Sequence, residues 1–301
     1  MSERQAGIWV ENQRHERAAR CLPLRHSAVF LIAARLTGLH AYASSMLAPA
    51  FPDAAGEALN EAPNQSDAAD TGKAEGESNH PAGWQHSKEL ILAELVVFAF
   101  IFTADWQGLI WFSKTPYLLA LGWISLRLRG LGWKDIGWSR YRSWGLTLAI
   151  GIASGIAIEA FELFVSGPLL TRLTGKPPDL EDFRPLIGSI KWLLLALAGT
   201  WTLAAVGEEF VYRGYLLNRL ADLGNRSRAA WIFALLTGSV VFALAHTYQG
   251  PTGVIEAGLD GLLLGALYLR CDRKLLLPVI AHGVTDTVDV LLIYLGKYPG
   301  V

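Results

Sequence analysis

The chain has 301 residues, of which 52% are hydrophobic and only 18% are charged, below the roughly 25% typical of soluble domains. A net charge of −1 gives no basic field for nucleic acid, and two cysteines suggest neither a disulfide framework nor a zinc cluster. From about residue 89 onward, apolar residues come in runs of 16 to 24, long enough to approach or span a bilayer core. The composition therefore predicts an integral membrane protein whose partners include membrane lipids and no nucleic acid.

The N-terminal part of the chain differs from the rest. Residues 53–80 carry seven Asp or Glu, one Lys and a single large aliphatic residue. Such a segment cannot bury enough apolar surface to offset its ordering entropy, so we expect disorder. Further upstream, basic residues precede an apolar patch interrupted by Arg35 and His40, which suits a targeting segment, an interfacial helix or an overextended reading frame. We expect a weakly structured or disordered extension over residues 1–86 and a transmembrane domain over residues 87–301.

The apolar runs predict about seven membrane-spanning helices. They cover residues 89–104, 107–126, 144–166, 188–211, 229–247, 253–270 and 275–295. The first two, joined by a short stretch, suit either a tight hairpin or one long broken helix. Loops on one predicted side hold twelve Lys or Arg, whereas the loops and tail on the other side hold four. By the positive-inside rule, the sequence predicts an all-α, polytopic helix bundle with its N-terminus in the cytoplasm.

Three charged residues end the fourth predicted span, where charge is costly. Glu209 and Arg213 are four residues apart, so a helix places them within pairing reach. Glu208 points about 100° away and stays unpaired, which suits a general base in a low-dielectric site. The alternative is a charged helix end, with Arg213 reaching toward lipid headgroups.

Two further spans carry ionisable residues. His246 ends the fifth span, where a lone histidine is more often a satisfied polar residue than a ligand, although ionisable residues inside a membrane usually face a cavity or a partner. His282 and Asp286 in the last span are four residues apart, so the carboxylate can orient the imidazole, or both can contact one water or ion. Asp289 extends that polar face, and the alternative for the pair is hydrogen bonding between helices.

These side chains are expected to gather around one small hydrated cavity, because each is expensive alone in hydrocarbon. Such a cavity supplies a base for water and donors for an oxyanion. Glu208, His246, His282 and Asp286 also resemble a zinc ligand set, although their spacing is not the HExxH pattern and does not itself imply a metal.

Other polar and small residues are interpreted structurally. Glu159 and Glu162, near the outer end of their span, are expected to face the interface, whereas Glu256 and Asp260 either do the same or line the cavity. The small-xxx-small pairs at 151/155 and 261/265 predict close helix packing.

Four motifs in order carry a resemblance to a known family. They are Glu208-Glu209-Phe-Val-Tyr-Arg213, Phe242-Ala-Leu-Ala-His246, the glycines Gly261 and Gly265, and His282-Gly-Val-Thr-Asp286. Over roughly residues 115–295, the chain resembles the intramembrane endopeptidases grouped as CAAX proteases and bacteriocin-processing enzymes (the CPBP or abortive-infection family), including the type 2 CAAX prenyl endopeptidases.

The resemblance implies a multi-pass protein of the bacterial inner membrane that hydrolyses peptide or membrane-protein substrates in or beside the bilayer. It implies that Glu208 activates the attacking water with help from His246. His282 and Asp286 would hold the water and stabilise the oxyanion. Glu209 and Arg213 would shape the site or grip a substrate carboxylate.

Metal dependence stays open at this stage. The family is described both as metalloproteases and as metal-independent glutamate proteases, so one divalent metal such as zinc is one of two alternatives. Asp286 stands where the prenyl-protein enzymes carry Asn, which favours a metal or a shared proton and makes CAAX processing less certain. Two other functions compete: a catalytically inactive membrane scaffold of the same fold, and a proton-coupled transporter, which predicts inverted repeats that the sequence does not show.

One conflict follows from the predicted topology. His282 should lie about 10 Å from the cytoplasmic end of its helix, whereas His246 should lie about 27 Å deep. The two can meet only if a helix is kinked, strongly tilted or re-entrant.

Overall fold

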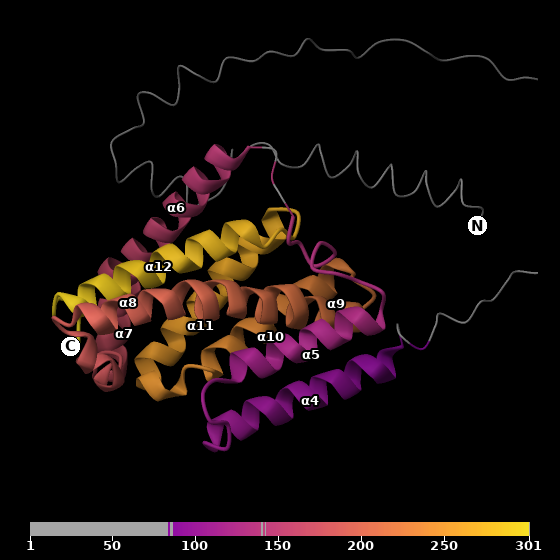
Figure 1. The fold of residues 1–301 in the computed structure, drawn as a ribbon, viewed down its shortest axis with the longest axis horizontal. Coiled ribbons are helices and arrows are strands. Elements are labelled where there is room, and N and C mark those ends of the chain that lie inside the picture. Colours follow the sequence, from indigo (N-terminus) through magenta and orange to yellow (C-terminus); the bar gives the residue numbers. More distant parts are fainter. Residues whose placement is uncertain (1–83, 85–86, 140, 142, 301) are drawn as a thin grey trace, which may run out of the picture. The chain divides into compact units, whose positions relative to one another are not determined.

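The computed structural model describes residues 84, 87–139, 141 and 143–300, and every regular element in this part of the chain is helical. The expectations for residues 1–83, including disorder at 53–80, fall outside it. The helices, labelled as in Figure 1, are α4 (Lys88–Trp106), α5 (Lys114–Leu128), α6 (Trp144–Phe161), α7 (Gly167–Thr174), α8 (Ile190–Gly199), α9 (Leu217–Leu223), α10 (Arg228–Leu244), α11 (Gly250–Arg270) and α12 (Leu276–Tyr294). Wider π turns occur at η2 (Glu162–Ser166) and η4 (Thr200–Leu216), and short 3₁₀ turns at η3 (Glu181–Leu186) and η5 (Thr247–Gln249).

Serine side chains fix where several helices begin. Ser87, Ser113, Ser143 and Ser227 precede α4, α5, α6 and α10, and each hydroxyl oxygen accepts a hydrogen bond from a backbone N–H of the first turn. These bonds satisfy backbone N–H groups that have no partner within the first turn of a helix. An N–H group left without a hydrogen bond beside lipid costs free energy. The loop at residues 107–113 separates α4 from α5, and the two helices pack together as a hairpin (Figure 1).

The predicted spans are confirmed as helices, although two run further than expected. Helical turns continue without a break through Trp144–Thr174 and Ile190–Leu223, because η2 and η4 join the flanking α-helices. These two segments, with Thr247–Arg270 and Leu276–Tyr294, are long and apolar enough to cross a membrane, and α10 is a shorter apolar helix. Four candidate spans support an integral membrane protein; a total of seven stays a prediction.

The helix formed by η4 and α9 lies at the centre of the packing. Every residue from Glu209 to Ala221 is buried, and η4 contacts α5, α8, α10 and α12. Aromatic side chains surround it: Phe98 stacks on Tyr215, and Phe242 meets Tyr212 edge to face. A helix buried on all sides holds its polar residues in a fixed place, because they cannot turn toward solvent.

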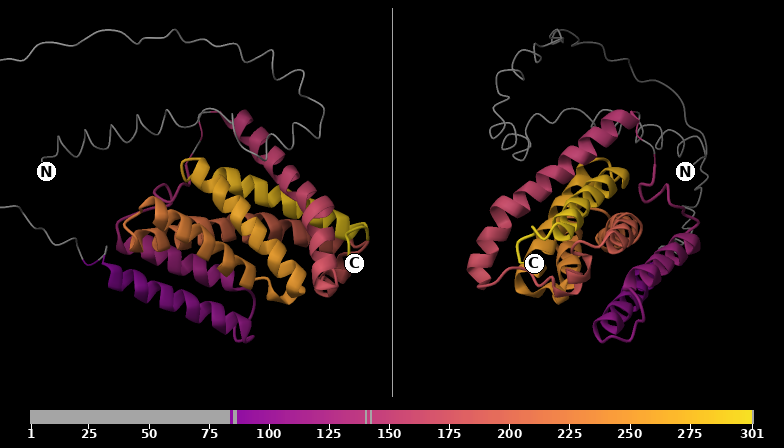
Figure 2. Two further views of the ribbon diagram at one scale, coloured as in Figure 1. Left: turned by 180° about the vertical axis from the view of Figure 1, so that it is seen from behind. Right: turned by 60° about the vertical axis from the view of Figure 1, so that its left-hand side comes forward.

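Glycines allow the close helix packing predicted for the small-xxx-small pairs. The helix α6 lies across α12 (Figure 2), and a Cβ at Gly155 would come 2.5 Å from the carbonyl oxygen of Ala281. A Cβ at Gly261 would lie 2.9 Å from the Cα of Ser239, where α11 packs on α10. Both interpretations are confirmed, since any side chain at these positions would push the helices apart.

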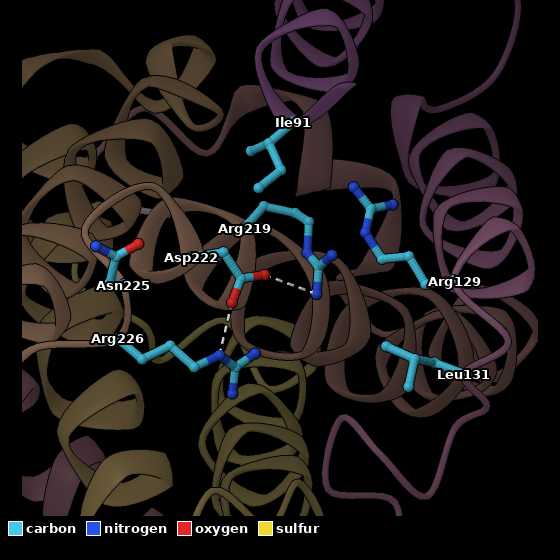
Figure 3. Close-up of a pocket in the computed structure, with 7 residues that line it drawn as sticks. All are labelled: Ile91, Arg129, Leu131, Arg219, Asp222, Asn225 and Arg226. Carbon is cyan, nitrogen blue, oxygen red and sulfur yellow. Dashed lines mark hydrogen bonds and ion pairs between the residues drawn. The ribbon is translucent and has the colours of Figure 1, made fainter. Parts of the chain in front are cut away.

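A polar pocket of about 410 Å³ lies between α4, α5 and α9, and its side chains are drawn in Figure 3. Asp222 pairs with Arg219 at 3.0 Å and with Arg226 at 2.6 Å. Arg129, which points into the same space, is buried and donates to Glu94 Oε1 at 2.5 Å, while its Nη2 has no hydrogen-bond partner among the described residues. The Glu94 carboxylate is therefore the counter-charge that keeps this arginine tolerable in a buried place.

Glu94→Gln is expected to lower the free energy of unfolding by about 1–3 kcal/mol, because the amide fills the same space but leaves the charge of Arg129 uncompensated. Equilibrium unfolding in mixed micelles would measure the loss. Glu181→Gln removes an exposed carboxylate and should change stability by less than ~0.5 kcal/mol. Equal losses in the two variants would show that the buried pair adds nothing.

Candidate active site

Glu209 and Arg213 form the ion pair that their spacing predicts. Arg213 Nη1 donates to Glu209 Oε1 at 2.6 Å, and both side chains are buried. The other nitrogen of the guanidinium, Nη2, lies 3.4 Å from the carbonyl oxygens of Asp260 and Gly261 on α11. The guanidinium also lies 4.7 Å from the ring centre of Phe242. Arg213 thus joins η4 to both α10 and α11, so it is not a residue that reaches toward headgroups.

His282 joins the same carboxylate from the opposite helix. Its Nδ1 lies 2.9 Å from Glu209 Oε1, and because a carboxylate only accepts, Nδ1 carries the hydrogen. Its Nε2 lies 3.5 Å from Asp286 Oδ1, so the predicted His282–Asp286 pair is in contact, but loosely. Gly283 lets this part of α12 come close to η4, since a Cβ there would lie 2.6 Å from the ring of Trp201. One oxygen of Glu209 therefore fixes the orientation of both Arg213 and His282.

His246 lies just beyond the end of α10, beside the same cluster. Its Nδ1 is 2.9 Å from the carbonyl oxygen of Phe242, so Nδ1 donates and Nε2 keeps its lone pair in the neutral ring. The ring of Phe242 lies 4.8 Å from that of His246 and 6.1 Å from that of His282. Phe242 thus lies between the two histidines and in contact with both rings. The large difference in membrane depth that the sequence predicted for His246 and His282 does not keep them apart, because that prediction counted residues along each helix and ignored how the helices cross.

Glu208 lies next to Glu209 but takes no part in the ion pair with Arg213. It is half-buried, and among the described residues none makes a hydrogen bond or an ion pair with it. It interacts electrostatically with His282, Asp286 and Tyr248, which places its charge beside the cluster. Its role as a base stays a prediction.

The four residues that resemble a zinc ligand set do not form one here. In the described part of the chain, the ligand atoms of Glu208, His246, His282 and Asp286 do not converge within 4.8 Å of one another in groups of three or more. The donor set as it stands does not fit a tetrahedral zinc ion.

The sequence interpretation missed a second group of acids. Glu159 and Glu162, expected at the interface, are only 3% and 7% exposed. They lie with Asp289 of α12 because the continuation of α6 through η2 turns both glutamates toward that helix. Asp260 lies between this group and the cluster, since it interacts electrostatically with His246, His282 and Glu162. The sequence does carry a signal for this group: two glutamates three residues apart lie on one face of an apolar span, and another apolar span carries Asp289.

Comparisons with known proteins support the motif analysis over part of the chain. Residues 190–288, which include every motif residue above, match the family model described as type II CAAX prenyl endopeptidase Rce1-like. A curated relative, an uncharacterized 24.3 kDa protein of Escherichia coli, is 36% identical over 107 residues, which cover 34% of this chain and 46% of the relative. The chain therefore aligns with less than half the length of that relative.

No solved structure matches the chain. The resemblance read from the motifs is confirmed by this match: residues 190–288 are similar to the Rce1-like family.

Proposed function

We propose that the protein is an intramembrane endopeptidase that hydrolyses a peptide bond with water activated by Glu208 and histidine. The observation that carries the proposal is an unpartnered carboxylate beside a histidine whose orientation is fixed by a buried Glu209–Arg213 pair. A carboxylate left without a partner is available to take a proton, whereas the neighbouring Glu209 is fully engaged. The similarity to a family of prenyl endopeptidases supports the same class of reaction.

In the first step, Glu208 takes a proton from water as the water oxygen attacks the carbonyl carbon of the scissile bond. Nε2 of His246 carries a lone pair in the neutral ring and can accept the second hydrogen of that water. The water is thereby held by two acceptors, which aims its remaining lone pair at the substrate. Tyr248 is half exposed, and its ring lies 5.9 Å from that of His246.

In the second step, His282 stabilises the oxyanion that forms on the substrate carbonyl. With Nδ1–H bound to Glu209, a protonated ring directs Nε2–H toward Asp286. That contact is long at 3.5 Å, so it can be exchanged for a shorter bond to the oxyanion. The intermediate then collapses, the C–N bond breaks, and the leaving nitrogen takes the proton from Glu208.

The proposed substrates are peptides or membrane proteins that reach the site within the bilayer, and CAAX-type processing is included among them. The proposed location is a bacterial inner membrane with the N-terminus in the cytoplasm, following the distribution of Lys and Arg in the loops. The alternative function is a catalytically inactive scaffold of the same fold. This alternative is favoured only if the folded protein cleaves no peptide.

The purified protein should be reconstituted in vesicles and offered three peptides: a prenylated one ending in a CAAX sequence, its unprenylated twin, and a transmembrane peptide. Cleavage of at least one, located by mass spectrometry, is the expected result. Cleavage of the prenylated peptide alone would assign CAAX processing. Absence of cleavage for all three, with the protein folded, would favour the scaffold.

The same assay tests metal dependence. Activity that survives treatment with a zinc chelator, with no zinc in elemental analysis, is expected because the ligand atoms of Glu208, His246, His282 and Asp286 do not converge within 4.8 Å of one another. Loss of activity that zinc alone restores would overturn the metal-independent mechanism while leaving the endopeptidase function in place.

A further inference from the structure

A second set of acids converges where α6 and η2 meet α12, apart from the residues of the proposed mechanism. Ligand oxygens of Glu159, Glu162 and Asp289 all lie within 4.8 Å of one another. The two glutamates are 97% and 93% buried, since their exposed fractions are 3% and 7%. Like charges at such separations repel strongly when solvent does not screen them. Either a positive charge among these oxygens or protons on the carboxylates must therefore relieve this repulsion.

The described residues supply no positive charge to these oxygens. Both carboxylate oxygens of Glu159, and one each of Glu162, Asp260 and Asp289, are buried and have no hydrogen-bond partner among the described residues other than one another's carboxyl groups. No Lys, Arg or His in that part of the chain forms an ion pair with Glu159, Glu162 or Asp289. Two ionised carboxylates cannot hydrogen-bond to each other, so either shared protons or a cation must hold them together.

We propose that Glu159, Glu162 and Asp289 bind one hard divalent cation of the size of Ca²⁺. All the donors are carboxylate oxygens, the ligands that Ca²⁺, Mg²⁺ and Mn²⁺ prefer, whereas zinc favours nitrogen and sulfur. Three atoms within 4.8 Å of one another have a common point within about 2.8 Å of each, close to the Ca–O distance of about 2.3–2.6 Å. The roughly 2.0–2.1 Å needed by Mg²⁺ would require a larger contraction.

Two further buried oxygens belong to residues that neighbour these carboxylates in space or along the helix. Asp260 interacts with Glu162, and its unpartnered Oδ1 is buried. Ser166 ends η2 one turn after Glu162, and its hydroxyl is also buried without a partner. Since Ca²⁺ takes six to eight oxygen ligands, these groups and water fill the positions that three carboxylates leave.

The site has a route to water. A pocket of about 430 Å³ is lined by Glu162, Glu256, Gly167 and Tyr298, among other residues of α7 and the C-terminal segment. Gly167 has no side chain there, and a Cβ would lie 3.1 Å from Glu256 Oε1, so the glycine lets that carboxylate stay at the pocket wall. A cation in this pocket would thus meet two carboxylates of its wall, Glu256 and Glu162, and Glu162 belongs to the buried group.

The proposal does not depend on the proposed protease function. Asp260 and Asp286 couple the two regions electrostatically, but neither His282 nor Glu209 contributes an oxygen or nitrogen to the group around Glu159. A cation there would tie α6 to α12, the pair of helices that Gly155 brings into close contact. Binding can therefore be measured without any substrate.

The test uses the full-length protein in nanodiscs of uncharged lipid, stripped with EGTA and then titrated with radioactive Ca²⁺ alone in equilibrium dialysis. About one Ca²⁺ per chain is expected, with Mg²⁺ and Zn²⁺ competing weakly. Glu159→Gln combined with Asp289→Asn should weaken binding by at least about tenfold. The control, Glu181→Gln with Asp182→Asn, removes two exposed acids and should bind like the wild type.

Thermal unfolding in EGTA separates lost binding from lost folding. The Glu159→Gln, Asp289→Asn variant should unfold at the same or a higher temperature than the wild type, because repulsion is relieved, and its midpoint should not respond to Ca²⁺. The wild-type midpoint should rise with Ca²⁺. If the wild type binds no more Ca²⁺ than the variant, the proposal fails. A wild-type midpoint that also falls as pH rises would then show that shared protons hold the carboxylates together.

Discussion

Glu208→Gln is expected to reduce the rate of peptide cleavage by about 10²–10⁴-fold, the usual contribution of a general base, while leaving the thermal unfolding midpoint unchanged. The amide keeps the shape of the side chain but cannot take a proton from water. No partner depends on the carboxylate, because no described residue forms a hydrogen bond or an ion pair with Glu208. The rate is measured at saturating substrate in vesicles, and the midpoint by thermal unfolding of the same preparation.

Glu181→Gln serves as the matched control, since it makes the same chemical change at an exposed position and should keep the full rate. If Glu208→Gln retained more than about a tenth of the wild-type rate, another group would have to be the base. If it lost both activity and stability, Glu208 would have a structural role that the contacts do not show. Only loss of activity with an unchanged midpoint supports the proposed role.

Local patterns along one helix could be predicted from the sequence. Apolar runs located the helices, and the i,i+4 spacing of Glu209 and Arg213 correctly predicted their ion pair. The same spacing predicted the contact of His282 with Asp286. These predictions succeed because residues four apart are neighbours on any helix, whatever surrounds it.

Relations between helices could not be predicted in the same way. Nothing in the spacing of Glu209 indicated that its carboxylate would also accept from His282, 73 positions further along the chain. Glu159 and Glu162 were expected at the interface because they end an apolar run, but η2 continues the helix and buries both against α12. Crossing angles and wide turns decide such contacts, and a one-dimensional pattern contains neither.

Glu209→Leu is expected to lower the free energy of unfolding by about 3–5 kcal/mol, the cost of removing one partner from a buried ion pair. Glu209 is fully buried, and its Oε1 accepts from both Arg213 and His282. Leucine fills most of the space but leaves the guanidinium of Arg213 without a counter-charge, with two weak contacts to carbonyl oxygens at 3.4 Å and the ring of Phe242 at 4.7 Å. Cleavage should fall as well, because His282 loses the acceptor that fixes its ring. Equilibrium unfolding in mixed micelles and the vesicle assay measure the two effects.

A double-mutant cycle separates the pair from the other losses. Arg213→Met added to Glu209→Leu removes the uncompensated charge, so it should recover part of the stability without restoring cleavage. The exposed pair Glu181–Arg184 is the control, and its coupling should be about 0–1 kcal/mol. If the buried pair showed no more coupling than the exposed one, Glu209 would act on His282 alone, and the anchoring role of Arg213 would be wrong. Strong coupling, together with a Glu208 variant that is stable but inactive, would divide the adjacent glutamates into one that holds the site and one that reacts.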